Sequence, residues 1–126
     1  MAIGRDTTAA NIKPLEGAQV DRFTAGAAIA AGELVSMSSD GYIDPSDSTA
    51  AKNPVLGVAV QAATAAGERI DVVVHGRVKC LTGATPGALV YNSTTAGEPL
   101  ETTAGNQTVA GIAVSANVLF VRPSNA

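Results

Sequence analysis

The chain has 126 residues, a formal net charge of −3 and one cysteine, and 46% of its residues are hydrophobic although only 3% are aromatic. This length predicts one domain, which buries roughly two-thirds of the surface of its unfolded chain. The 8 basic residues are scattered, whereas a surface that follows nucleic-acid phosphates needs clustered lysine and arginine, so we expect no direct contact with nucleic acid. No apolar run approaches the ~20 residues of a membrane span, and the N-terminus lacks the plan of a signal peptide. We therefore expect no membrane contact and a soluble protein made inside a cell.

Residues 1–20 differ from the rest of the chain, because they are polar, mixed in charge and without a sustained apolar period. Pro14 and Gly17 interrupt any regular element there. Such a segment is typical of an extended N-terminal arm that becomes ordered on a partner. Its thinly spaced apolar side chains are the candidate contacts with that partner: Ile3, Ile12 and Leu15.

Short β-like segments begin at residue 20, each bounded by Gly, Pro, Asn, Asp or Ser. This pattern predicts an all-β core domain over residues 21–126, built as a small barrel or sandwich of short strands. Two alanine-rich segments, 25–31 and 61–66, favour helix by propensity but are too short to form one alone, and we interpret them as connections. The expected strands are residues 20–24, 33–38, 42–43, 55–61, 69–75, 77–81, 89–91, 109–115 and 117–122.

The core contains one pattern written twice. Residues 32–35 (GELV) are matched by residues 87–90 (GALV), and residues 55–62 (VLGVAVQA) are matched by residues 109–116 (VAGIAVSA) at nearly the same offset. Neither copy is large enough to bury an apolar face alone, whereas two packed copies are. We therefore predict an internal two-fold sequence repeat. Its halves span about residues 32–76 and 87–122, and the Ser/Thr/Asp-rich loops at 38–54 and 91–108 are candidate contact faces.

The residues that could support catalysis are few. His75 is the one histidine and ends an apolar strand, and Cys80 lies in an alternating apolar segment typical of a small buried hydrophobe. One histidine and one cysteine do not make a tetrahedral zinc site. We therefore expect no enzyme, no catalytic residue and no cofactor. Asp40, Asp44 and Asp47 share one loop, but the glutamate that closes a calcium-binding hand is missing; turn formation explains them more simply, and a weak metal site stays open.

The order of several short phrases resembles that of the capsid cement, or head decoration, proteins of tailed bacteriophages. These phrases are A-I-x-A-G-E-L-V, D-G-x-I, N-P-V-L-G-V-A, A-G-E-x-I-x-V-V-V-x-G, G-A-L-V-Y and V-A-G-I-A, and together they extend over about residues 22–122. The resemblance rests on order and spacing, since no single residue is diagnostic.

The resemblance implies a β-rich protein on the outer surface of an icosahedral head, where it stabilises the shell against the pressure of the packaged DNA. The implied partner is the major capsid protein, the implied state is a homotrimer, and the implied location is the virion surface after synthesis in the host cytoplasm. The arms of such proteins often add to the strands of the capsid. No enzymatic site or cofactor is implied. A different class stays open, namely a surface- or carbohydrate-binding β module of a virion fibre or adhesin.

Overall fold

The structure is a computed structural model that describes residues 3–48, 54–101 and 108–124. The predicted all-β class is confirmed: within these ranges strands dominate, and the helical structure is one 3-10 turn, η1 (Ala9–Asn11). No helix in the described ranges is long and apolar enough to cross a membrane. The strands are β1 (Gly4–Arg5), β2 (Lys13–Pro14), β3 (Gln19–Thr24), β4 (Leu34–Met37), β5 (Ile43–Pro45), β6 (Gly57–Ala59), β7 (Arg69–Lys79), β8 (Leu81–Thr82), β9 (Leu89–Asn92), β10 (Pro99–Leu100), β11 (Val109–Ala113) and β12 (Val118–Ser124).

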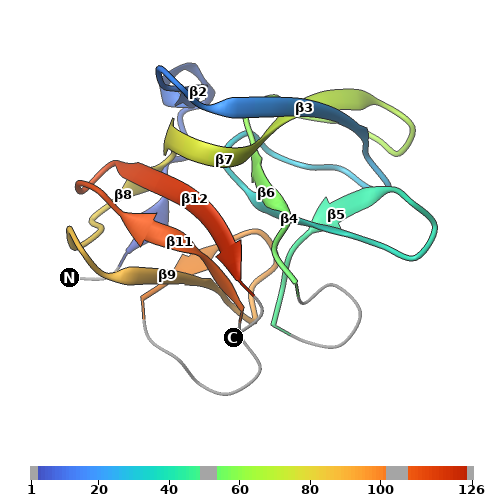
Figure 1. The fold of residues 1–126 in the computed structure, drawn as a ribbon. Coiled ribbons are helices and arrows are strands. Elements are labelled where there is room, and N and C mark those ends of the chain that lie inside the picture. Colours follow the sequence, from blue (N-terminus) through green and yellow to red (C-terminus); the bar gives the residue numbers. More distant parts are fainter. Residues whose placement is uncertain (1–2, 49–53, 102–107, 125–126) are drawn as a thin grey trace.

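Most of these strands form one strongly curled sheet that resembles half of a barrel (Figure 1). Its order is β10-β9-β11-β12-β7-β6-β4-β5, with β2 and β3 also paired to β7, and β1 pairs separately with β8. From the central β12–β7 pair, one side of the sheet continues with β11, β9 and the short edge strand β10. The other side continues with β6, β4 and the short edge strand β5. Strands β11 and β6 are called the middle strands below. Below, the first half denotes residues 32–76 and the second half denotes residues 87–122.

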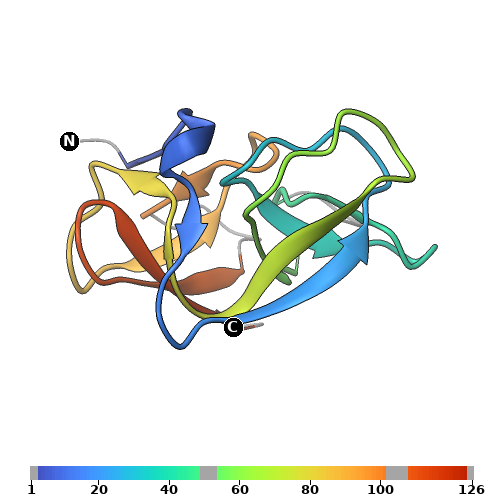
Figure 2. The same cartoon turned by 90° about the horizontal axis from the view of Figure 1, so that it is seen from above.

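Strand β7 pairs with strands of both halves, and Figure 2 shows it extending from one side of the sheet to the other. Val72 and Val73 pair with β6, whereas residues 76–79 pair with β12. The prediction of two separate strands here, with a break at Gly76, is wrong. Gly76 has a φ of 108° and continues the ladder, and a Cβ at this position would lie 2.8 Å from the Cα of Ala18. Because Gly76 has no side chain, it adopts this positive φ inside the strand and leaves room for the backbone at Ala18.

Two hydrophobic clusters hold the sheet together. The main core lies between the halves and takes Leu34, Val58 and Val73 from the first half, packed with Val90 and Leu119 from the second. The second core lies on the other side of the first half, where the two alanine-rich connections, which contain no helix, cover it. Its members are Ala25, Ile29, Val35, Ile43, Ala59, Ala63, Ile70 and Val72.

A buried polar network joins the halves near the two ends of the sheet. Asn92 is fully buried, and its side-chain amide donates to the hydroxyl of Ser46 and to the carbonyl of Asp47, both at 3.1 Å. The amide oxygen of Asn92 accepts from the backbone N–H of Thr108 at 2.9 Å. The backbone N–H of Gly97 donates to the carbonyl of Ser46 at 2.7 Å. Hydrogen bonds between buried polar groups therefore join the two halves.

Candidate functional site

The N-terminal segment lies on the core of its own chain. β1 pairs with β8, and β2 pairs with the end of β7. Ile12 belongs to the main core and is 7% exposed, and Ile3 is half-buried against the same cluster. Leu15 is half-buried, and its backbone N–H donates to the carbonyl of Arg77 at 2.9 Å. Contact of Ile3 or Ile12 with a capsid would require the segment to leave this position, and the capsid-binding arm stays a prediction.

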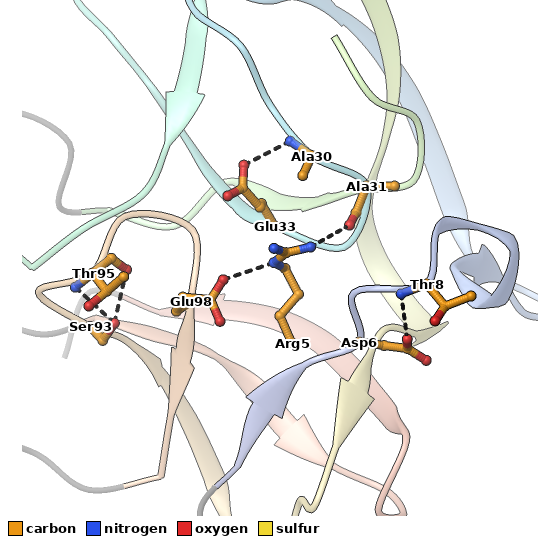
Figure 3. A network of polar contacts seen from close by, with 9 residues as sticks. All are labelled: Arg5, Asp6, Thr8, Ala30, Ala31, Glu33, Ser93, Thr95 and Glu98. Carbon is orange, nitrogen blue, oxygen red and sulfur yellow. Dashed lines mark hydrogen bonds and ion pairs between the residues drawn. The ribbon is translucent and has the colours of Figure 1, made fainter. Parts of the chain in front are cut away.

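Arg5 ties the start of the chain to the second half and to the turn that precedes the first half (Figure 3). Its guanidinium forms an ion pair with Glu98 at 2.8 Å and donates to the carbonyl of Ala31 at 3.3 Å. Beside it, burial raises the pKa of Glu33, while the N–H that Ala30 donates to this carboxylate acts in the opposite direction. A charge-assisted, partly buried hydrogen bond thus holds Arg5, at the end of β1, to Glu98, which directly precedes β10.

Replacing Ile12 with alanine is expected to lower the free energy of unfolding by about 2–5 kcal/mol, because the change opens a cavity in the main core. Leu15→Ala is the matched control, since this side chain is half-buried, and we expect a loss of about 1 kcal/mol. Urea unfolding followed by circular dichroism measures both. Equal, small losses would mean that the segment does not rest on the core.

The residues considered for catalysis do not form a reactive pair. His75 packs its ring edge-on against Phe120, with centroids 5.3 Å apart and an interplanar angle of 76°. Cys80 is fully buried, and this burial raises the pKa of its thiol to about 12, with the nearby Asp6 carboxylate acting in the same direction. Because the thiolate is the nucleophilic form, Cys80 is unreactive in the folded protein.

The acidic loop of the first half shapes a turn. The Asp40 carboxylate accepts the backbone N–H of Tyr42 at 3.0 Å, and the Asp44 carboxylate accepts the hydroxyl of Ser38. Asp47 contributes its backbone carbonyl to the network around Asn92. In the part of the chain that the structure describes, no group of three or more His, Cys, Asp or Glu side chains could hold a metal ion. Residues 49–53 and 102–107 of the predicted contact loops lie outside the described residues.

The second half presents an apolar surface to solvent, here called the outer face. Val90 and Leu119 point into the main core, so the residues that alternate with them point outward. Ile112 lies directly opposite Leu89 on one neighbouring strand and Phe120 on the other, which makes a continuous apolar row. The outer face consists of Leu89, Tyr91, Ile112, Val118 and Phe120, with Lys13, Arg77, Lys79 and Arg122 around them.

Two hollows open on the outer face. One has a volume of about 290 Å³ and lies between His75, Arg77 and Phe120, with Glu16 at its edge. The other has a volume of about 230 Å³ and is lined by Leu89, Val109, Gly111, Ile112 and Arg122. Sequence reasoning did not find this surface, although one signal was present: basic residues alternate with core residues in Arg77-Val78-Lys79 and in Val121-Arg122. A face of this composition suits contact with another macromolecule.

Comparison with known proteins extends these observations. A search of the curated proteins finds no match. The sequence does match the phage cement protein family over residues 15–118, which include the strands from β3 to β11 and end at the first residue of β12. A family of this kind associates with the phage capsid and points to a structural rather than an enzymatic role. The all-β fold and the extent of the match agree, and the chain belongs to the phage cement protein family.

Proposed function

We propose that this chain binds the outer surface of an icosahedral phage head and stabilises the capsid lattice from outside. The observation that carries the proposal is the family match over residues 15–118. The implied partner is the major capsid protein, and the protein reaches the virion surface after synthesis in the host cytoplasm. Function then resides in exposed surfaces, which agrees with the unreactive Cys80 and with the ring contact of His75.

We further propose that the working unit is a homotrimer. A shell offers the same binding surface many times, and three linked copies bind three equivalent positions with an effective concentration that one copy lacks. Closed symmetry is the usual state of homo-oligomers, and a three-fold trimer fits a local three-fold position of a lattice.

The N-terminal segment is the second part of the proposal. We assign residues 1–20 as the capsid-binding arm and residues 21–126 as the core domain. Leu15 and the exposed residues near it can reach a partner from their present position, whereas Ile12 must first leave the main core. Strand addition to the capsid would replace the pairing of β1 with β8 by an equivalent pairing with a capsid strand.

The internal repeat is the third part. The two sides of the sheet follow the same strand order, and Gly57 and Gly111 occupy the same place in their middle strands. In both halves the glycine that precedes the first strand of the pattern has a positive φ, 91° at Gly32 and 86° at Gly87. These correspondences support the proposal that the halves are two copies of one unit.

Co-sedimentation with expanded heads that lack this protein tests the function. We expect saturable binding to heads of the parent phage, and the control is the same assay with unexpanded heads, whose lattice spacing differs. Absence of binding to expanded heads would contradict the proposal. Binding to host-surface glycans without binding to heads would favour the fibre or adhesin alternative.

A further inference from the structure

Equivalent rows of side chains differ in burial between the two halves. In the first half, Val58 lies opposite Leu34 and Val73, and all three are at most 1% exposed in the main core. In the second half, Ile112 lies opposite Leu89 and Phe120 in the same arrangement. Leu89 is 44% exposed, and the other two are half-buried. The row of Leu34, Val58 and Val73 is therefore buried in the main core, whereas the equivalent row of Leu89, Ile112 and Phe120 is left uncovered.

The charges around the uncovered row have no partner of opposite sign among the described residues. Lys13 and Lys79 are direct cross-strand neighbours, a like-charge pair that destabilises a sheet. Arg77 lies opposite Phe120, and Arg122 lines the smaller hollow. Within the described residues none of these four side chains forms an ion pair, and Glu16 is the acidic residue at the edge of the larger hollow. An occupant of the outer face is therefore expected to combine apolar and acidic side chains.

The tip of the β4–β5 hairpin has this combination. Met37 is 40% exposed, Tyr42 is 44% exposed, and the exposed Asp40 lies between them in the turn. No lysine, arginine or histidine occurs from residue 23 to residue 51. The tip thus offers two large apolar side chains and a carboxylate, and the outer face offers two neighbouring hollows with basic residues at their edges. Aromatic and methionine side chains that fill such hollows are typical anchors of protein interfaces.

We propose that the outer face of one copy of this chain receives the β4–β5 hairpin tip, residues 37–42, of a second copy. Pairing of two outer faces is disfavoured because it would bring Arg77 and Lys79 against the same charges. The two surfaces of the contact are different, so the contact is heterologous. Repetition of such a contact forms a ring when the rotation between copies closes, as the proposed trimer requires, and an open filament when it does not. The inference deepens the proposed homotrimer by assigning its interface, and it is measurable without any capsid.

Sedimentation velocity and light scattering of the full chain test the contact. Leu89→Lys and Tyr42→Lys change exposed side chains on the two surfaces, and each is expected to weaken self-association at least about tenfold. Ala66→Lys is the matched control, because it introduces the same charge at an exposed position outside both surfaces and outside residues 1–20. It is expected to leave the oligomer unchanged, and circular dichroism verifies that all three variants fold.

A mixture of Leu89→Lys and Tyr42→Lys proteins makes the test directional. Each variant keeps the surface that the other has lost, so we expect the mixture to form dimers but no closed ring. For the charges, Asp40→Lys and Arg77→Glu are each expected to weaken association, and the double variant is expected to recover part of it. A monomeric wild-type chain, or a Leu89→Lys protein that remains fully associated, would overturn the inference. If Leu89→Lys abolishes head binding but not self-association, the outer face binds the capsid; the inference then fails while the proposed function stands.

Discussion

Replacing Gly57 or Gly111 with alanine is expected to destabilise the folded state by about 3 kcal/mol or more. A Cβ at Gly57 would overlap the backbone carbonyl oxygen of Val73, and one at Gly111 would overlap that of Phe120. In both cases the overlapping atom belongs to a hydrogen-bonded neighbouring strand, so the sheet itself has to move. Equilibrium unfolding in urea measures the effect, and failure to accumulate as folded protein is its limiting form.

Gly67→Ala and Gly87→Ala are the matched controls for these two substitutions. They make the same chemical change where a Cβ meets nothing within 4 Å, although φ is positive at both positions. We expect each to cost about 1–2 kcal/mol, the strain of a side chain in the left-handed region. A loss at Gly57 no larger than that at Gly67 would show that the close approach of two strands does not determine the requirement for glycine at Gly57.

The second large effect is expected at Asn92, where substitution by alanine should lower the free energy of unfolding by about 3 kcal/mol. The change removes both donors and the acceptor of a fully buried amide and leaves polar groups of Ser46, Asp47 and Thr108 without it. Because these groups belong to both halves, the substitution also weakens the contact between the halves. Thermal or urea unfolding of the full chain measures the change.

Asn117→Ala is the control for Asn92→Ala. The Asn117 side chain makes one comparable hydrogen bond, to the carbonyl of Leu81 at 3.1 Å, but the residue is exposed and water can replace it. We expect a loss of about 1 kcal/mol. If the two asparagine variants lose equal stability, the buried network does not contribute to the joining of the halves.

The sequence was informative wherever a strand is bounded by turn residues and repeats an apolar pattern. The strands β3, β4, β11 and β12 all fall within the predicted segments or within two residues of them. The strands β1 and β2 were not predicted, because strands of two residues carry no period and are held by backbone pairing. The continuity of β7 was missed for a related reason: Gly76 looks like a break in sequence, and only the passing backbone at Ala18 shows why a glycine lies inside a strand.

The candidate site was harder to predict than the fold. An isolated isoleucine in a polar segment looks the same whether it awaits a partner or fills its own core, and Ile12 does the latter in the structure. The outer face was missed because Leu89 and Ile112 have the sequence pattern of buried residues. The same alternation produces a buried row in the first half. The difference arises from the way the two halves pack together, and the sequence pattern of a single half does not predict that packing.

Stabilisation of the head tests the proposed function most directly. Heads that lack this protein would be heated with and without the purified chain, and DNA release would be followed with a fluorescent dye. We expect saturating protein to raise the temperature of DNA release, and Ala66→Lys protein, changed outside the arm and the outer face, to act like the wild type. A release temperature that does not change although the protein is bound to the heads would contradict a cement function.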